Sequence, residues 1–184
     1  MGTFNLAKFR TTVASIARTQ YFKVDIDDSN MSSDKLTAWA RSTTLPSKEH
    51  ETLNVPFRGL DMKIDSKPTF APWTVTFLAD EAHTLRNTFA KWMAEAYNIT
   101  NLENVSHTVY KSDAVRAYQL DSKGKEQVGF HLFGAFPSTV GQIDVNQEGG
   151  AVQTFDVTFT YDYFIMGKGT QIPTDSSSQE DVAT

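Results

Sequence analysis

Apolar and polar residues alternate along several stretches of this chain, which is the pattern of a β-strand with one buried face. The longest example covers 154–163, where Phe155, Val157 and Phe159 alternate with threonine and aspartate. The Lys123-Gly124 pair between two such stretches predicts a hairpin turn. Further strands are predicted at 21–27, 36–44, 59–65, 73–78, 109–110, 114–120 and 127–133. The pattern therefore predicts a mainly β protein.

One helix is predicted among these strands, from Glu81 to about Tyr97. Asp80 can accept hydrogen bonds from the first free amides, and Glu81 in the first turn complements the helix dipole. The apolar residues recur at helical spacing, so their side chains form one stripe that is expected to lie on a sheet. The expected helix–sheet core consists of Leu85, Phe89, Trp92, Met93, Phe155, Val157 and Phe159.

Three segments lack a clear strand or helix pattern. Residues 4–19 have mixed three- and four-residue apolar spacing, which is typical of an amphipathic arm or a short helix. Residues 45–56 contain two prolines that remove backbone donors, so this irregular stretch is expected to be a projecting loop or an edge segment. Residues 167–184 are rich in serine, threonine and acids, which predicts a flexible tail or an arm that orders on assembly. We expect an N-terminal arm at 1–20, one β domain at 21–165 and a flexible C-terminal tail at 166–184.

Composition and charge narrow the function. A length of 184 residues suits a single domain with a sizeable core. The net charge of −5 leaves no excess of basic residues of the kind that neutralises phosphates, so tight DNA binding is not expected. The chain has no cysteine, which excludes a disulfide framework and a thiolate zinc site. No apolar run approaches the roughly 18 residues that a membrane span needs.

Candidate catalytic and metal-binding residues are scarce. The four histidines are not paired at the spacing of a metal motif, and His83 is expected to make local hydrogen bonds near the helix start. Asp25, Asp27 and Asp28 lack the spacing and the glycine of a calcium loop, so they are expected on a solvated strand face. We therefore expect no catalytic residue, no metal site and no cofactor, and an enzyme is the last choice.

Several short motifs nevertheless occur in a distinctive order. The motifs are TTLP at 43–46, VPF at 55–57, TFAPWTVT at 69–76, DEAH at 80–83, YKSDAVR at 110–116, GAFPSTVG at 134–141 and VQTFDVTF at 152–159, together with Arg86, Trp92, Asp162 and Tyr163. Over roughly residues 20–164, their order resembles the tail tube proteins of contractile-tailed bacteriophages, which share a fold with the tubes of pyocins and of type VI secretion.

The resemblance implies an antiparallel β-sandwich or barrel with one flanking amphipathic helix at about 80–97. Six copies would close their sheets into a ring-shaped β-barrel, and stacked rings would form the inner tail tube through which the phage genome passes. Such closure also covers the strand edges that otherwise promote aggregation. The implied partners are further copies of the chain, the tail sheath, the baseplate or initiator, and the tail terminator. Double-stranded DNA would pass without adhering. The implied location is the virion tail, assembled in the host cytoplasm.

The resemblance also implies roles for particular residues. Strands near 36–44, 59–65, 114–121 and 126–133 are expected on the channel side. Their outward residues either face the channel or lie on a solvated outer face. The channel candidates are Arg41, Asp61, Lys63, Asp65 and His131. The residues expected to contact neighbouring subunits or rings are Leu45, Pro46, Val55, Pro56 and Phe57.

Two other functions remain compatible with the sequence. The tube could belong to a phage-derived contractile injection system of the pyocin or type VI secretion kind, because the subunit sequence barely separates the two. A monomeric β-sandwich binding module is the alternative from a different class. The expected burial of the aromatic stripes leaves such a module no obvious binding site.

Overall fold

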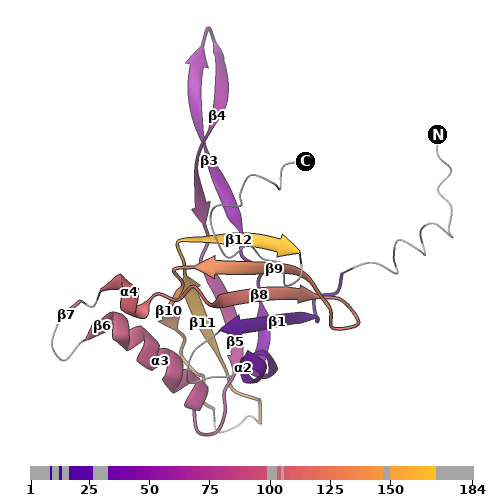
Figure 1. Ribbon diagram of the computed structural model, residues 1–184, viewed down its shortest axis with the longest axis vertical. Helices are drawn as coiled ribbons and strands as arrows, with labels where there is room; N and C mark the ends of the chain where they lie inside the picture. Colours follow the sequence, from indigo (N-terminus) through magenta and orange to yellow (C-terminus); the bar gives the residue numbers. More distant parts are fainter. Residues whose placement is uncertain are drawn as a thin grey trace.

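The protein is described by a computed structural model that covers residues 9, 13, 17–26, 33–98, 103–104, 106–146 and 150–168. Two four-stranded antiparallel sheets form its body (Figure 1). The first sheet has the strand order β1-β8-β9-β12, with β1 at Phe22–Ile26, β8 at Val115–Leu120, β9 at Glu126–Phe133 and β12 at Tyr163–Lys168. The second has the order β10-β11-β5-β2, with β10 at Phe136–Val140, β11 at Thr154–Thr160, β5 at Trp73–Leu78 and β2 at Ala40–Thr43.

Two strand pairs and three helices complete the described part of the chain. The long hairpin consists of β3 at Lys48–Phe57 and β4 at Leu60–Phe70, and the short pair consists of β6 at Tyr97–Asn98 and β7 at Glu103–Asn104. The helices are α2 at Ser33–Trp39, α3 at Thr84–Ala96 and α4 at His107–Tyr110. The predicted mainly β, antiparallel fold with a flanking helix is therefore confirmed.

The core lies between the two sheets and under α3. Strands β5 and β11 pair so that three apolar residues of each strand share one face. On the first sheet, Val24, Val115 and Leu132 are fully buried in the same cluster. The ring of Phe89 on α3 lies 5.3 Å from that of Phe77. Burial stabilises a Val or Phe side chain by roughly 1.5–3 kcal/mol. The six paired residues, each at most 2% exposed, are Trp73, Val75, Phe77, Phe155, Val157 and Phe159.

The predicted helix stripe is only partly buried. Leu85 and Phe89 lie in the core, and the indole of Trp92 donates a 2.7 Å hydrogen bond to the Tyr110 carbonyl. Met93 was expected in the core, but it is 38% exposed. At 100° per residue, two steps of four residues rotate Met93 by about 80° from Leu85, which carries it out of the stripe.

The chain passes between the two sheets twice at one corner, after β9 and after β11. Gly134 adopts a positive φ of 62°, and a Cβ atom there would lie 2.3 Å from a carboxylate oxygen of Asp162. The Gly134 amide donates to the Asp113 carboxylate at 2.6 Å, and Lys111 Nζ lies 2.7 Å from the Asp162 carboxylate. Glycine is therefore required at position 134, because the backbone there has a positive φ and because a Cβ atom would clash with Asp162.

The prediction of a strand at 36–44 is wrong for the first half of this segment. Residues up to Trp39 belong to α2, and only Ala40–Thr43 form a strand. Leu36 is fully buried, and the Thr37 hydroxyl donates a 2.7 Å hydrogen bond to the Val24 carbonyl of β1. Leucine, lysine and alanine favour helices, and a short run of alternation did not outweigh that preference.

Other boundaries also differ from prediction. The continuous strand expected at 154–163 is divided into β11 and β12, because the chain turns at the sheet-crossing corner. The strand expected at 109–110 lies in α4, and β10 was not predicted. The helix begins at Thr84 instead of Glu81, although Asp80 still caps it by accepting from the Thr84 amide at 3.0 Å.

The described strands reach close to both expected ends of the domain. Strand β12 continues to Lys168, past the start expected for the C-terminal tail. Most of the expected N-terminal arm, and the chain beyond residue 168, lie outside the described residues. The strands predicted at 21–27, 73–78, 114–120 and 127–133 are confirmed as β1, β5, β8 and β9.

Candidate assembly surface

The β3–β4 hairpin projects from the body of the subunit, at one end of its long axis (Figure 1). Its pairing runs from Lys48 opposite Phe70 to Phe57 opposite Leu60. Ten residues of β3 at about 3.3 Å each make the hairpin roughly 30 Å long. Every residue of β3 is exposed, and so is β4 except for its last two residues. A two-stranded hairpin alone is only marginally stable in water, so this one is suited to a partner.

For residues 45–56, the sequence predicted either an irregular projecting loop or an edge segment. The prediction of an irregular loop is wrong. Residues Lys48–Phe57 form a strand with one register shift between His50 and Thr52, and Pro56 pairs with Asp61 near the tip. Proline is tolerated because both strands of an isolated hairpin are edge strands, where an unpaired position needs no backbone donor. The segment is therefore an edge strand of a projecting hairpin.

The tip is a two-residue turn formed by Arg58 and Gly59. Both residues have positive φ, at 48° and 86°. Positive φ at both central positions characterises the type I′ turn, whose twist matches that of the flanking strands. The Arg58 guanidinium lies 5.5 Å from the centre of the Phe57 ring. The tip thus presents a cation next to exposed apolar side chains.

The hairpin has one apolar face and one polar face. Alternate residues of a strand point to opposite faces, and residues paired across two strands share a face. The polar hairpin face carries the pairs Thr52–Asp65, Asn54–Lys63 and Pro56–Asp61. The apolar hairpin face carries the pairs Leu53–Ile64, Val55–Met62 and Phe57–Leu60. Its six side chains are between 38% and 74% exposed. An exposed apolar surface of this kind marks a site of protein–protein contact.

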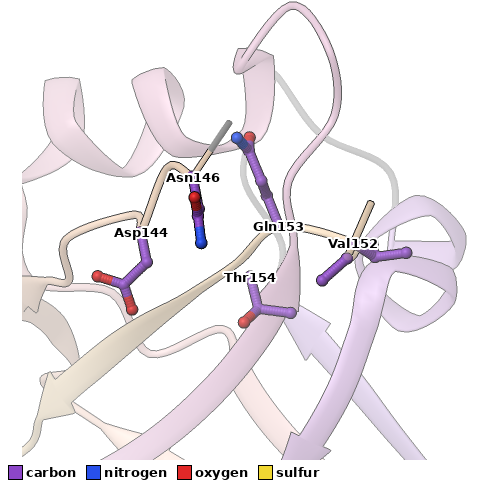
Figure 2. Close-up of a pocket in the computed structure, with 6 residues that line it drawn as sticks. Asp144, Asn146, Val152, Gln153 and Thr154 are labelled. Atoms are coloured by element: carbon purple, nitrogen blue, oxygen red, sulfur yellow. The ribbon is translucent and has the colours of Figure 1, made fainter. Parts of the chain in front are cut away.

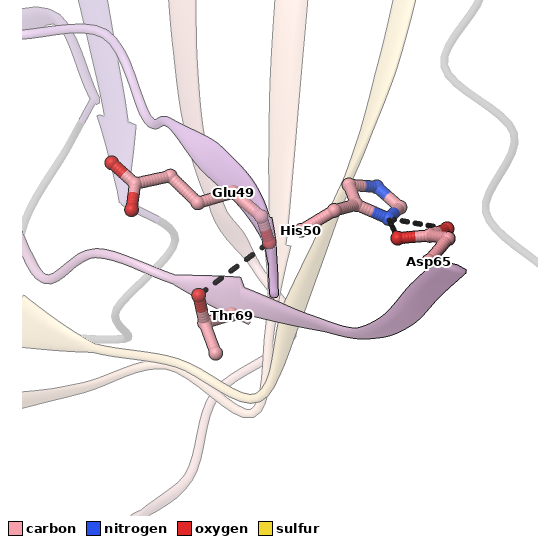
Figure 3. Close-up of polar contacts among 4 residues, drawn as sticks. All are labelled: Glu49, His50, Asp65 and Thr69. Carbon is pink, nitrogen blue, oxygen red and sulfur yellow. Dashed lines mark hydrogen bonds and ion pairs between the residues drawn. The ribbon is translucent and has the colours of Figure 1, made fainter. Parts of the chain in front are cut away.

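Charges on the hairpin are balanced. Nδ1 of His50 lies 3.0 Å from both carboxylate oxygens of Asp65 near the base (Figure 3). The Thr69 hydroxyl donates to the Glu49 carbonyl at 3.4 Å in the same view. With histidine neutral, four acidic and four basic side chains of residues 48–70 cancel: Glu49, Glu51, Asp61 and Asp65 against Lys48, Arg58, Lys63 and Lys67. The hairpin therefore has no cationic excess that would attract phosphates.

The residues predicted to contact other subunits are distributed over the hairpin and its entry. Val55 and Phe57 belong to the apolar hairpin face, and Pro56 belongs to the polar one. Leu45, just before the hairpin, is 41% exposed, whereas Pro46 is buried within the subunit. Sequence reasoning missed Leu53, Leu60, Met62 and Ile64, although they alternate with polar residues as the predicted strands do.

The predicted channel residues are not all on one surface. Asp61, Lys63 and Asp65 lie together on the polar hairpin face, and Arg41 is exposed on β2. His131 is only 3% exposed. Its ring lies 4.3 Å from that of Phe133, and its Nε2 contacts the Asp113 carbonyl. His131 therefore presents almost no surface within the subunit.

Both sheets end in strands that have one unpaired side in the described part of the chain. These are β1 and β12 in the first sheet, and β10 and β2 in the second. Unpaired strand edges expose backbone donors and acceptors, which makes them templates for pairing with another chain. The subunit thus offers two kinds of contact surface, the open edges and the apolar hairpin face.

Two kinds of feature are absent from the described residues. They contain no group of three histidine, aspartate or glutamate side chains placed to hold a metal ion. Nor is any helix among them both long and apolar enough to cross a membrane.

Comparison with known proteins agrees with this geometry. The tail tube protein gp19 of Enterobacteria phage T4 is 30% identical over 151 residues, which cover 80% of this chain and 90% of that protein. The tail tube protein gp19 of Enterobacteria phage T6 matches with the same identity and coverage.

Solved structures share the fold. A chain of the anti-feeding prophage baseplate has a TM-score of 0.62 at 14% identity, covering 84% of this chain and 97% of that one. A chain of the sheath–tube complex of the extracellular contractile injection system PVC has a TM-score of 0.59 at 12% identity, covering 90% and 99%. The family model described as phage tail tube protein matches residues 4–167, and this chain therefore belongs to the phage tail tube protein family.

Proposed function

We propose that this chain polymerises as stacked hexameric rings into the inner tail tube of a contractile-tailed phage, and that the genome passes through the channel of this tube. The family is structural, and the chain is not an enzyme. The observation that carries the proposal is the projecting hairpin with one exposed apolar face. A monomer has no partner for such a face, whereas a tube supplies one at every subunit.

Burial of the apolar hairpin face supplies the driving force for assembly. Its six side chains are on average more than half exposed in the subunit. Full burial of such a side chain is worth roughly 1.5–3 kcal/mol, so covering the exposed half of each contributes about 1 kcal/mol or more. The face then contributes roughly 5–9 kcal/mol per hairpin, against an association cost of about 4–15 kcal/mol. Further contacts are needed, and the open sheet edges provide them.

Ring closure uses the strand edges. Each sheet has two edges, and head-to-tail pairing of edges around a symmetry axis leaves none exposed. The width of a barrel grows with its strand number, so a ring of many strands encloses an aqueous channel. Hexameric closure and a continuous ring-shaped barrel are parts of this proposal.

The polar hairpin face is proposed to line the channel. If neighbours cover the apolar face, the opposite face remains for solvent, and it carries Asp61, Lys63 and Asp65. Arg41 is a further candidate, because it is exposed on β2. A wall without cationic excess avoids the counterion release that makes DNA adhere to basic surfaces. The balanced hairpin and the net charge of −5 both suit a passage for DNA.

The proposed partners are further copies of the chain, the tail sheath, the baseplate or initiator, and the tail terminator. Chains of the same fold come from a baseplate, a sheath–tube complex and a tube-terminating cap, which supports this set. We place the protein in the virion tail, with assembly in the host cytoplasm.

A second candidate is the tube of a phage-derived contractile injection system. The fold similarity to chains of the anti-feeding prophage and PVC favours it. The two candidates differ in their cargo and not in their assembly. Capsid and terminase genes next to the coding sequence would support the phage tail. A monomeric binding module has less support, because it leaves the apolar hairpin face without a use.

The proposal is tested by the assembly state of the purified full-length chain. Sedimentation velocity and negative-stain microscopy would be recorded over a range of concentrations, with and without the baseplate proteins of the same phage. The expected result is six-fold rings and hollow tubes of uniform width, nucleated by the baseplate. A chain that stays a compact monomer under all these conditions would refute the proposal.

A further inference from the structure

The end of the subunit opposite the hairpin is formed by loops around the far end of β5. This strand begins at Trp73, soon after the hairpin ends at Phe70, and runs away from it to Leu78. Leu78 pairs with Thr154, and the Ala79 amide donates to the Gln153 carbonyl at 2.9 Å. Six residues of β5 place these loops about 20 Å beyond the hairpin base. The hairpin tip and these loops are therefore at opposite ends of the molecule (Figure 1).

A depression of about 320 Å³ lies at this opposite end (Figure 2). Its lining comes from the segments before and after residues 147–149, and Asp144 is the one charged residue among the lining residues. Val152, which lines the depression, is 69% exposed, and Val145, next to the lining residue Asp144 in the chain, is 79% exposed. The lining residues are Asp144, Asn146, Ala151, Val152, Gln153 and Thr154.

The hairpin tip is chemically complementary to this depression. Phe57 and Leu60 next to the turn are 59% and 74% exposed, and Arg58 between them carries a positive charge. The depression presents the Asp144 carboxylate and the exposed Val152, and the exposed Val145 is adjacent to Asp144 in the chain. An apolar contact with one opposite-charge pair at its edge is the arrangement that fixes orientation at protein interfaces.

We propose that the hairpin tip of one copy docks in the depression of a second copy in the next ring. The Arg58 guanidinium faces the Asp144 carboxylate, while Phe57 and Leu60 cover Val145 and Val152. This inference rests on the proposed stacking of rings, and it names the surface that receives the hairpin. A contact between opposite ends of identical subunits does not close on itself, so it repeats and builds an open filament.

The docking also limits the spacing of the rings. The chain from Leu60 beside the tip to Leu78 at the depression, through β4 and β5, has 19 residues and spans at most about 60 Å when fully aligned with the tube axis. A tilt of the strands shortens that length along the axis. The axial repeat of the tube is therefore expected to be no more than about 60 Å.

Charge reversal tests the docking in the full-length chain. Arg58→Asp reverses the tip charge and keeps a residue type that tolerates positive φ. Asp144→Arg reverses the charge of the depression. Each single variant is expected to raise the critical concentration for tube formation about tenfold, and the double variant to restore it to within about threefold of the original. Lys123→Asp is the matched control, because Lys123 is exposed in the β8–β9 turn, outside both surfaces.

The outcomes separate this inference from the function on which it rests. Tubes from the unchanged chain, with both single variants assembling equally well, overturn the docking and leave the tube function intact. A double variant as defective as the singles overturns the pairing of Arg58 with Asp144. An equal assembly defect in Lys123→Asp also overturns the pairing of Arg58 with Asp144, because a change in net charge then explains the loss of assembly. If the unchanged chain forms no tubes with its baseplate, both the function and the docking fail. Thermal melting of each variant below the critical concentration is expected to match the original, since all three side chains are exposed.

Discussion

Removing apolar surface from the middle of the hairpin should impair assembly without impairing folding. Leu53 and Ile64 face each other across the hairpin, and they are 59% and 50% exposed. The double variant Leu53→Thr with Ile64→Thr places a β-branched residue at both positions, so the two segments retain their preference for the strand conformation. The change therefore isolates the burial of the apolar hairpin face in the tube.

The expected magnitude follows from these exposed fractions. Full burial of a leucine or isoleucine side chain is worth roughly 1.5–3 kcal/mol, and about half of that is still to be gained on assembly. Each substitution then costs about 1 kcal/mol, and the pair costs about 2 kcal/mol per contact. At about 1.4 kcal/mol for each factor of ten, the critical concentration for tubes should rise roughly 30-fold. The free energy of unfolding of the free subunit should change by less than about 1 kcal/mol.

The assay is pelleting of tubes over a concentration series, with urea unfolding of the unassembled subunit in parallel. The matched control is Asn54→Thr with Lys63→Thr, the neighbouring pair on the polar hairpin face. This control should assemble at nearly the original concentration. If the Leu53 and Ile64 variant assembles as readily as the unchanged chain, the apolar hairpin face is not buried in the tube, and the reasoning is wrong.

Two further predictions concern the stability of the subunit. Gly134→Ala should lower the free energy of unfolding by about 2–4 kcal/mol in urea titrations, because a left-handed φ and the Asp162 carboxylate 2.3 Å away both oppose a Cβ atom. Gly124→Ala, at a φ of 76° with open space around it, should cost only about 1–2 kcal/mol, and equal losses would contradict the steric part of the argument. Asp80→Ala should cost about 1 kcal/mol at neutral pH, measured in the same way. Burial alone raises the pKa of Asp80, but hydrogen bonds from Thr84 and Leu85 lower it overall below its ordinary value of 3.8. The stabilisation is therefore present above about pH 4 and is lost as the pH falls through the lowered pKa, so the stabilities of the two proteins should converge once the pH lies below that pKa. If the Asp80→Ala variant and the unchanged chain still differ in stability in acid, the Asp80 carboxylate is not the source of the stabilisation.

The strands of the core were predictable from sequence because their signal is local. Trp73, Val75 and Phe77 alternate with threonine, and the structure buries them in β5 as that pattern requires. The Asp80 cap was also predictable from residue type, although the helix starts a few residues later. In these segments, local preference and tertiary packing favour the same conformation.

The failures occurred where tertiary contacts override a local pattern. Leu36 and its neighbours alternate over too few residues to exclude a helix, and packing on β1 selects α2. The division between β11 and β12 depends on the sheet-crossing corner, which distant residues such as Lys111 and Gly134 create.

The hairpin was missed as a unit for two reasons. Its prolines indicated an irregular segment, and its Arg58-Gly59 turn lacks the asparagine or aspartate that usually precedes glycine in such turns. Its apolar face also has no intramolecular partner, so the alternation of Leu53, Val55 and Phe57 did not point to any surface of the subunit itself.

A cryo-electron microscopy map of the assembled tube would test the central claim most directly. The account predicts that each β3–β4 hairpin lies between neighbouring subunits, with Leu53 and Ile64 removed from solvent and with Asp61, Lys63 and Asp65 turned toward the channel. A map in which the hairpin stands free in solvent, or in which its apolar face lines the channel, would contradict it.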